Sequence, residues 1–212
     1  MNPVLVMVDI SEYKNKTCFD EAYDKLPKSR RIKIDSLRNE SGKLQSLGAG
    51  VAHSRAHVRI GSDLKDDGWE ISIDEFGKPR FDKHSEVHFS LSHSGRYAVC
   101  ALSDKEIGCD IEQNRKGCAC EKVASRFFAH AEQGYLDNFT DADKRISVFF
   151  DIWTRKESYI KAVGRGLAIP LHSFSVIDAT GRPVTDIDGY LYDNPDVEVS
   201  SDYSLSLCRK ME

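Results

Sequence analysis

The segment that most constrains this fold is residues 143–163, which has the apolar spacing of one long amphipathic helix. Asp141 precedes the pattern as a candidate N-cap, and Gly164 and Gly166 follow it, where glycine commonly ends helices. The apolar side chains recur every three or four positions and would form a single buried stripe. They are Phe149, Ile152, Trp153, Ile160 and Val163. The segment therefore predicts a long helix with an apolar face and a glycine-rich exit.

Glu157 and Lys161 lie at the edge of that stripe. At about 100° per residue, Glu157 falls about 40° round the helix from Trp153, and Lys161 falls about 40° further. A Glu–Lys pair at this spacing is usually a solvated surface pair that contributes roughly a few tenths of a kcal/mol. At the border of a core, the same pair can instead present a half-buried carboxylate and a half-buried cation to a cleft. The helix alone leaves both interpretations open.

The composition is that of a soluble globular protein, with 30% charged and 40% hydrophobic residues among 212. That length is enough for one large domain or two small ones. The formal net charge of -4 argues against a general nucleic-acid binder. No apolar run approaches the roughly 20 residues of a membrane helix, so we expect no membrane span. Residues 4–8 are predicted to be a strand rather than a signal peptide, which favours a cytoplasmic protein with reduced thiols.

The order of strand and helix patterns predicts an α+β fold of two similar α/β lobes. We place the N-terminal lobe at residues 1–104 and the C-terminal lobe at residues 105–212, each with a small, mostly antiparallel sheet packed on helices. Strands are expected at residues 1–9, 69–73, 87–91, 97–102, 107–112, 171–177, 189–192 and 203–208. Helices are expected at residues 19–26, 118–136 and 143–163. A further helical region is expected after the basic run 28–33, ending at about residue 57 and interrupted near 41–42.

Asp110 and Glu112 are the first candidates for chemistry. They are spaced i,i+2 on a predicted strand, so both project from one face, about 7 Å apart. Such a pair is most often a solvated face of a sheet. With Glu157 as a third oxygen ligand it would suit Mg²⁺, which takes one or two carboxylates together with water and substrate phosphates. Lys161, one turn from Glu157, could hold a phosphate of the same substrate.

Three further polar segments could bind anions. Ser92 and His93 lie in a predicted polar turn, whose free backbone N–H groups could form an anion-binding nest. Lys78 and Pro79 belong to a stiff glycine–proline turn that could clamp a phosphate, and a basic run covers residues 28–33. Each segment also has an ordinary structural explanation, as a hairpin connection, a solvated turn or a charged surface.

A zinc site is not predicted, although His84, His88 and His93 have a spacing that would suit a helix. Residues 87–89 have the pattern of a strand, and no cysteine pair joins the histidines at zinc-site spacing. The chain also lacks the Gly-x4-Gly-Lys-Ser/Thr order of a phosphate-binding P-loop.

Four motifs follow one another within residues 27–177. They are Gly77-Lys78-Pro79, Phe89-Ser90-Leu91-Ser92-His93-Ser94, Ile107-Gly108-Cys109-Asp110-Ile111-Glu112, and Trp153-Thr154-Arg155-Lys156-Glu157-Ser158-Tyr159-Ile160-Lys161. Each motif is weak alone, but the four in this order resemble the 4′-phosphopantetheinyl transferases. The length resembles the surfactin-synthetase-activating branch, in which one chain holds two similar lobes in a pseudo-twofold arrangement. Cys109 departs from the branched aliphatic residue that is usual there, a change expected to leave metal binding intact.

The resemblance implies an enzyme that moves the 4′-phosphopantetheine arm of coenzyme A onto a serine of an apo carrier protein and releases adenosine 3′,5′-bisphosphate. It implies a site between the lobes in which Asp110, Glu112 and Glu157 hold Mg²⁺. Glu157 would also be the base for the carrier serine, and Lys161 would assist at the phosphate. The residues implied to bind coenzyme A are Lys28, Arg31, Lys78, Pro79, Ser92, His93 and Lys161.

The resemblance also implies a monomer whose residues 164–195 face an acyl, peptidyl or polyketide carrier protein. Acidic helices of that carrier would meet Arg155, Lys156 and Arg165. Two alternatives stay open at this point. A Mg²⁺-dependent phosphohydrolase of a nucleotide-like pyrophosphate would use the same carboxylates with water as nucleophile. A non-catalytic protein would bind coenzyme A or the carrier without turnover.

Overall fold

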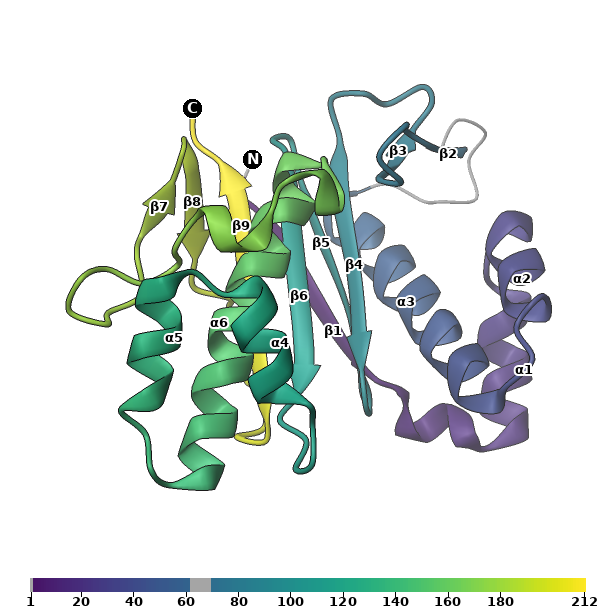
Figure 1. Ribbon diagram of the computed structural model, residues 1–212. Helices are drawn as coiled ribbons and strands as arrows, with labels where there is room; N and C mark the ends of the chain where they lie inside the picture. The colour runs from purple at the N-terminus through teal and green to yellow at the C-terminus, as the bar shows by residue number, and fades with distance from the viewer. Residues whose placement is uncertain (1, 62–69) are drawn as a thin grey trace.

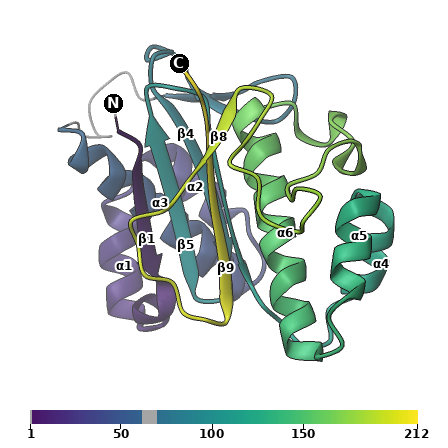
Figure 2. The same ribbon diagram turned by 90° about the vertical axis from the view of Figure 1, so that its left-hand side faces the viewer.

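Two antiparallel sheets pack against each other, and one long helix covers the outer side of each sheet (Figures 1 and 2). The computed structural model describes residues 2–61 and 70–212. Each sheet buries one face on its helix and the other against the neighbouring sheet, so the layers follow the order helix, sheet, sheet, helix. The predicted α+β fold, with antiparallel sheets packed on helices, is confirmed.

The first sheet has the strand order β1-β5-β4. Its strands are β1 (Val4–Asp9), β4 (His88–Ser94) and β5 (Tyr97–Ser103). The helices of this half are the 3-10 helix η1 (Ile10–Lys14), α1 (Lys16–Asp24), α2 (Lys28–Asp35) and α3 (Glu40–Arg59). Every residue of the central strand β5 is buried. Ala98, Cys100 and Leu102 alternate along β5 and share a core with Leu47 and Ala52 of α3.

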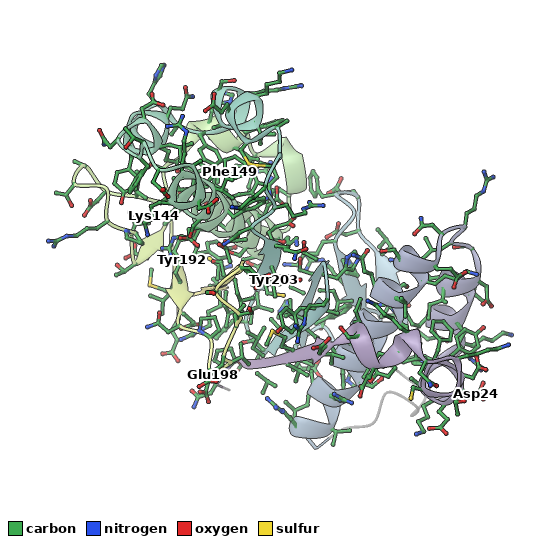
Figure 3. All side chains as sticks on the ribbon, turned by 90° about the horizontal axis from the view of Figure 1, so that it is seen from below. Asp24, Lys144, Phe149, Tyr192, Glu198 and Tyr203 are labelled. Carbon is green, nitrogen blue, oxygen red and sulfur yellow. A yellow bond between two sulfur atoms is a disulfide. The ribbon has the colours of Figure 1, made fainter. Side chains whose placement is uncertain are left out.

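The second sheet has the strand order β6-β9-β8-β7. Its strands are β6 (Ile107–Gln113), β7 (Asp186–Ile187), β8 (Tyr190–Asp193) and β9 (Tyr203–Lys210). The helices are α4 (Cys120–Phe127), α5 (His130–Asp137) and α6 (Ala142–Val163), with 3-10 helices η2 (Gly166–Ala168) and η3 (Leu171–Ser173). Helix α6 lies along β6 and β9, and α4 and α5 pack on its other side around Phe149 (Figures 1 and 3).

The predicted long helix is confirmed, including both of its ends. The Asp141 carboxylate caps the N-terminus of α6 by accepting the Lys144 amide at 2.7 Å. Gly164 ends the helix in the left-handed conformation, with a φ of 79° that favours glycine. These two caps fix where the helix starts and stops, and hence the register of its charged side chains.

A two-stranded hairpin belongs to neither sheet and reaches the end of α6. Its strands are β2 (Ile71–Ile73) and β3 (Pro79–Phe81). The turn predicted between them is confirmed, because the Asp74 carboxylate accepts the amides of Phe76 and Lys78 at 3.0 and 2.9 Å. Trp69, predicted to begin the first strand, lies outside the described residues.

The two sheets meet in an apolar core that contains residues of β1, β5, β6 and β9. Tyr203 lies between the halves (Figure 3), where its ring packs edge-on to Tyr97 at 4.8 Å and its hydroxyl accepts the Arg96 amide at 2.9 Å. Gly95 adopts a φ of 54° in the adjoining turn, and a Cβ there would lie 2.2 Å from the Tyr203 hydroxyl. This turn therefore requires glycine for both its conformation and its contact.

Three of the predicted element boundaries are wrong. Residues 118–136 form α4 and α5 rather than one helix, because the two residues between these helices have an extended backbone. Residues 171–177 form η3 and one isolated bridge rather than a strand. The predicted interruption of the helical region exists, but it lies at residues 36–39 rather than near 41–42, because Asn39 caps the start of α3.

Ser92 and His93 lie within β4 rather than in the predicted turn. Backbone pairing with β5 continues to the last position of the strand, where Ser94 faces Tyr97. The turn is therefore shorter than predicted, and the polar side chains project from a strand. The amides of these residues belong to a sheet edge rather than to an anion-binding nest.

Cys118 and Cys120 are joined in a disulfide, so the expectation of reduced thiols is wrong for this pair. Within residues 2–61 and 70–212, no helix combines the length and the apolar character needed to cross a membrane.

Candidate active site

A cleft of about 760 Å³ opens between the two halves of the molecule. Its walls come from α2, α3, the β2–β3 hairpin, β4, β6 and α6. Most of the site residues predicted from the sequence line this one cleft. They are Lys78, Pro79, Ser92, His93, Asp110, Glu112, Glu157 and Lys161. Residues more than 80 positions apart in the chain thus converge on a single cavity.

Asp110 is the most enclosed of the three predicted metal ligands, with 4% of its surface exposed. Its Oδ1 accepts hydrogen bonds from Lys161 Nζ at 2.7 Å and from Ser92 Oγ at 2.8 Å. Its Oδ2 is buried and has no hydrogen-bond partner. A buried carboxylate oxygen without a partner is costly, so Asp110 retains capacity for one more positive group.

Glu157 and Lys161 face Asp110 because α6 lies unusually close to β6. A Cβ on Gly108 would stand 2.1 Å from the Ser158 carbonyl oxygen, inside the backbone of α6. Glycine at this position therefore permits the helix to rest directly on the strand. Ser158 Oγ also lies 2.8 Å from Ser206 Oγ, which fixes the helix against β9. The two charges at the edge of the apolar stripe consequently point into the cleft.

The three carboxylates repel one another in a poorly solvated place. Burial raises the pKa of Glu157 to about 7, and the charges of Asp110 and Glu112 add to the rise while Lys161 opposes it. Burial also raises the pKa of Glu112, against a hydrogen bond from Ser94 Oγ at 2.6 Å. This pattern is typical of a functional site, because it costs stability that only a bound cation would restore.

The donor set fits Mg²⁺ by its chemistry. All three side chains offer carboxylate oxygens, which this hard cation prefers, and the partnerless Asp110 Oδ2 is a free donor among them. Among the residues that the structure describes, no three acidic, histidine or cysteine side chains already stand together as a metal cluster. Lys161 forms an ion pair with Asp110, and its ammonium group satisfies one of the two carboxylate oxygens.

The opposite wall of the cleft is basic, but with residues other than those predicted. Arg30 and Lys33 line it, whereas Lys28 is exposed on another face of α2 and Arg31 stacks over Tyr23 at 5.9 Å. Two residues turn a helix by about 200°, so the predicted pair faces away. Burial lowers the pKa of His93, and the positive charges of Lys161, Lys33 and Arg30 lower it further.

The inward position of Arg30 depends on Gly50 of α3. A Cβ on Gly50 would stand 2.9 Å from Arg30 Cγ and 3.0 Å from Leu26 Cδ1. The glycine lets α2 approach α3 closely, with Arg30 on the inner side. A glycine in α3 marks a place of close approach, but no signal in the run 28–33 itself indicates which of its faces is turned inward.

Lys78 has a structural role in addition to its place in the cleft wall. Its Nζ donates to the Ala162 carbonyl at 2.7 Å and to the Ile107 carbonyl at 3.4 Å. Burial lowers its pKa to about 8. The hairpin turn is therefore tied to the last turn of α6 and the start of β6, where Lys78 and Pro79 border the cleft.

Two of the three residues predicted to meet a carrier protein are engaged inside the molecule. Lys156 is fully buried, and its Nζ lies 2.8 Å from Glu132 Oε2. Arg155 stacks over Tyr192 at 3.8 Å and donates to a backbone carbonyl. Arg165 is exposed, beside Phe76 at the mouth of the cleft. The prediction is wrong for Lys156, because its side chain projects into the packing between α5 and α6.

Residues 106–208 match the sequence profile of the 4′-phosphopantetheinyl transferase superfamily. The matched segment contains both β6 and α6. The chain is 42% identical over 124 residues to the 4′-phosphopantetheinyl transferase Sfp of Bacillus subtilis (strain 168), a match covering 58% of this chain and 51% of that one. It is 42% identical over 100 residues to the 4′-phosphopantetheinyl transferase gsp of Aneurinibacillus migulanus, covering 47% of this chain and 40% of that one.

The chain therefore matches about half the length of these transferase relatives. Among solved structures, a holo-(acyl-carrier-protein) synthase from Bacillus anthracis in complex with CoA (3′,5′-ADP) overlaps with a TM-score of 0.38 and 19% identity, over 47% of this chain and 91% of that chain. The relationship to the Sfp-type transferases thus rests on the sequence. The geometry of the cleft is an independent observation.

Proposed function

We propose that this chain transfers the 4′-phosphopantetheine arm of coenzyme A to a serine of an apo carrier protein and releases adenosine 3′,5′-bisphosphate. The observation that carries the proposal is the distribution of charge in the cleft. Asp110, Glu112 and Glu157 stand on one wall, and Arg30 and Lys33 stand on the other. A substrate with several phosphates needs cations along its length and a metal ion where it reacts, and this cleft offers both.

The reaction would form a bond from the carrier serine oxygen to the phosphorus next to pantetheine. The bond from that phosphorus to the bridging oxygen would break, and adenosine 3′,5′-bisphosphate would leave with this oxygen. Mg²⁺ held by Asp110, Glu112 and Glu157 would supply charge neutralisation at the pyrophosphate oxygens. Glu157 would accept the serine proton, directly or through a water.

Lys161 would hold the phosphate side of the substrate. Its ammonium group has three N–H donors, of which two point to Asp110 Oδ1 and to the Cys109 carbonyl at 2.7 and 3.2 Å. Burial lowers the pKa of Lys161, but the charge and hydrogen bond of Asp110, together with the charge of Glu157, more than offset it. The pKa is therefore raised, and the group stays charged at neutral pH. A third donor remains for a phosphate oxygen.

The remaining predicted contacts support the binding of coenzyme A around this centre. We assign the phosphates to His93, Arg30 and Lys33, and the adenine side to Lys78 and Pro79. Ser92, also predicted to bind a phosphate, donates its one hydroxyl hydrogen bond to Asp110. Lys28 and Arg31 are not among the proposed phosphate contacts, because they face away from the cleft. We also propose that the enzyme is a monomer, since one chain supplies both walls of the cleft. We further propose that it is cytoplasmic. Light scattering after gel filtration and cell fractionation test these two statements.

The test is an incubation of the protein with coenzyme A, Mg²⁺ and a panel of apo acyl, peptidyl and polyketide carriers. We expect at least one carrier to gain the mass of phosphopantetheine, and no gain when the metal is chelated. Absence of a gain on every carrier would reject the proposal. Hydrolysis of coenzyme A in the absence of a carrier, faster than transfer, would instead favour the phosphohydrolase. Binding of coenzyme A with no product would favour the non-catalytic protein.

A further inference from the structure

Three serines of β4 connect the two halves of the molecule. Ser90, Ser92 and Ser94 occupy alternate positions, so their side chains leave the same face of the strand. Their hydroxyl oxygens accept hydrogen bonds from backbone amides of β6, which belongs to the other sheet. The pairs are Cys109 N to Ser90 Oγ at 3.0 Å, Ile111 N to Ser92 Oγ at 3.4 Å, and Gln113 N to Ser94 Oγ at 3.1 Å.

The three bonds keep a constant register. In each pair, the β6 residue lies 19 positions after the serine, so the two strands run in parallel and step together (Figure 1). The serine hydroxyls take the place that backbone carbonyls would occupy in a parallel ladder. This side-chain ladder satisfies the edge amides of β6, which would otherwise be buried without partners.

Two of the three hydroxyls make a second contact. Ser92 Oγ donates to Asp110 Oδ1 at 2.8 Å, and Ser94 Oγ donates to Glu112 Oε2 at 2.6 Å. In the described part of the chain, no carboxylate accepts a hydrogen bond from the Ser90 hydroxyl. Ser92 and Ser94 therefore each join an edge amide of β6 to the carboxylate of the adjacent residue.

A hydroxyl that accepts from an amide has its remaining proton aimed by that bond, so its donor direction is fixed. A carboxylate that accepts a hydrogen bond from this hydroxyl loses rotational freedom. The entropy cost of ordering the carboxylate is then paid during folding, before any ligand binds. For a metal ion, the ligand oxygens are then already oriented. The backbone register of two different sheets is thereby transmitted to the carboxylate positions.

We propose that Ser92 and Ser94 are positioning residues that orient Asp110 and Glu112 for the metal ion through the side-chain ladder between β4 and β6. This inference rests on the proposed function, because it concerns the same metal site. It adds a role for Ser94, which belongs to neither the predicted nor the proposed ligands. It also explains why Ser92, which was predicted to bind a phosphate, instead donates its hydrogen bond to the Asp110 carboxylate.

The test compares Ser94→Thr with Ser94→Val, two side chains of the same shape that differ in the hydroxyl. Binding of Mn²⁺ to the whole protein is measured by electron paramagnetic resonance, with no carrier present. We expect Ser94→Val to raise the Kd for Mn²⁺ about tenfold or more, and Ser94→Thr to keep most of the wild-type affinity. Thermal melting of both variants checks that each one folds.

Ser90 provides the matched control, because it makes the same bond to β6 without touching a carboxylate. Ser90→Thr and Ser90→Val should bind Mn²⁺ alike, even where Ser90→Val lowers the melting temperature. Equal Kd values for the two Ser94 variants, or an equally large difference between the two Ser90 variants, would overturn the positioning role alone. Wild-type protein that binds no Mn²⁺, with or without coenzyme A, would overturn both this role and the proposed metal site.

Discussion

At the scale of single residues, Glu157 combines the properties that the proposed chemistry needs. It lines the cleft, stands one helical turn from Lys161, and has a pKa raised to about 7 by burial first and by Asp110 next. An ordinary surface pair on a helix has neither the burial nor the second carboxylate. The interpretation of Glu157 and Lys161 as a solvated pair is therefore wrong, since Lys161 pairs with Asp110 instead.

Glu157→Gln should abolish transfer while the protein stays folded. The amide is close in size but cannot accept the serine proton, so we expect kcat to fall by about 10² to 10⁴. Asp110→Ala should do the same, because it removes a ligand and leaves Lys161 without its partner. Initial rates with a saturating carrier measure both effects, and circular dichroism checks the fold.

Glu198→Gln is the control for these variants, because Glu198 is exposed at the edge of the molecule, away from the cleft (Figure 3). It should keep the wild-type rate. A Glu157→Gln protein with near wild-type turnover would show that the base is another group.

The sequence indicated the carboxylates of the cleft well, for a physical reason. The alternation of a strand puts Asp110 and Glu112 on one face, and helical spacing puts Glu157 at the edge of an apolar stripe. It could not indicate Arg30 and Lys33, because the run 28–33 has no apolar periodicity to orient it. The face that turns inward is decided by the approach of α2 to α3 at Gly50, a tertiary contact.

At the scale of elements, a buried ion pair joins α5, α6 and the segment that follows α6. Lys156 and Glu132 have fully buried side chains. Lys156 Nζ also donates to the carbonyls of Leu171 and Phe174 at 2.8 and 2.7 Å, and Glu132 Oε1 accepts the Val176 amide at 2.8 Å. The charges are thus fully satisfied in a dry place, which makes each dependent on the other.

Lys156→Met should lower the free energy of unfolding by about 3–5 kcal/mol, because it leaves the Glu132 charge buried without a partner. The double variant Glu132→Gln/Lys156→Met should lose less than the sum of the two single losses, since neither charge remains. Urea denaturation measures all three values. Lys144→Met, on the exposed side of α6 (Figure 3), should change the free energy by less than about 0.5 kcal/mol. Additive losses would contradict the coupling.

Helix α3 carries a buried histidine that should make the fold sensitive to acid. His53 is 3% exposed and stacks on Phe89 at 4.5 Å and on Phe81 at 5.7 Å. Burial, with the charges of His57 and Arg30, lowers its pKa well below the usual value. Below about pH 6.5 the histidine binds a proton in the unfolded chain but stays neutral in the folded protein. The free energy of unfolding therefore falls as the pH falls.

His53→Gln should flatten this dependence. Between pH 7 and pH 5, the free energy of unfolding of the wild type should fall more steeply than that of the variant, by up to about 1.4 kcal/mol per pH unit. Urea denaturation at several pH values measures the two slopes. His172→Gln, at an exposed position, should keep the wild-type slope. Parallel slopes for wild type and His53→Gln would show that other groups cause the acid sensitivity.

Elements with a strong period were predicted well, and those whose ends depend on distant partners were not. The caps of α6 lie in its own sequence, at Asp141 and Gly164. By contrast, β4 extends through its serines because β5 and β6 supply partners for them. Residues 171–177 looked like a strand by their apolar content. Their backbone instead bends around the Lys156 ammonium group and the Glu132 carboxylate, which no local pattern reveals.

At the scale of the whole molecule, the cleft exists because β6 lies between the two halves and touches both. Its edge amides join β4 through the serines, and Gly108 lets α6 rest on its other side. The change from the first sheet to the second falls between β5 and β6. The predicted boundary between lobes at residues 104 and 105 stays a prediction, which limited proteolysis of the folded chain would examine.

Gly108→Ala should destabilise the molecule strongly. The added Cβ would lie 2.1 Å from the Ser158 carbonyl and 2.3 Å from the Ala162 amide, both backbone atoms of α6. We expect a loss of about 3 kcal/mol or more, together with weaker metal binding as α6 moves outward. Gly134→Ala is the control, because nothing lies within 4 Å of a Cβ there. Alanine inside α5 should be neutral or stabilising. A Gly108→Ala protein as stable as the wild type would contradict the close packing of α6 on β6.

The most direct measurement of the proposed transfer is the stoichiometry of its two products. A responsive apo carrier is incubated with the protein, coenzyme A and Mg²⁺. Tandem mass spectrometry locates the adduct on the carrier, while chromatography measures adenosine 3′,5′-bisphosphate. We predict phosphopantetheine on one serine of the carrier and one adenosine 3′,5′-bisphosphate for each modified carrier. Consumption of coenzyme A with no modified serine, on any carrier offered, would contradict the transfer.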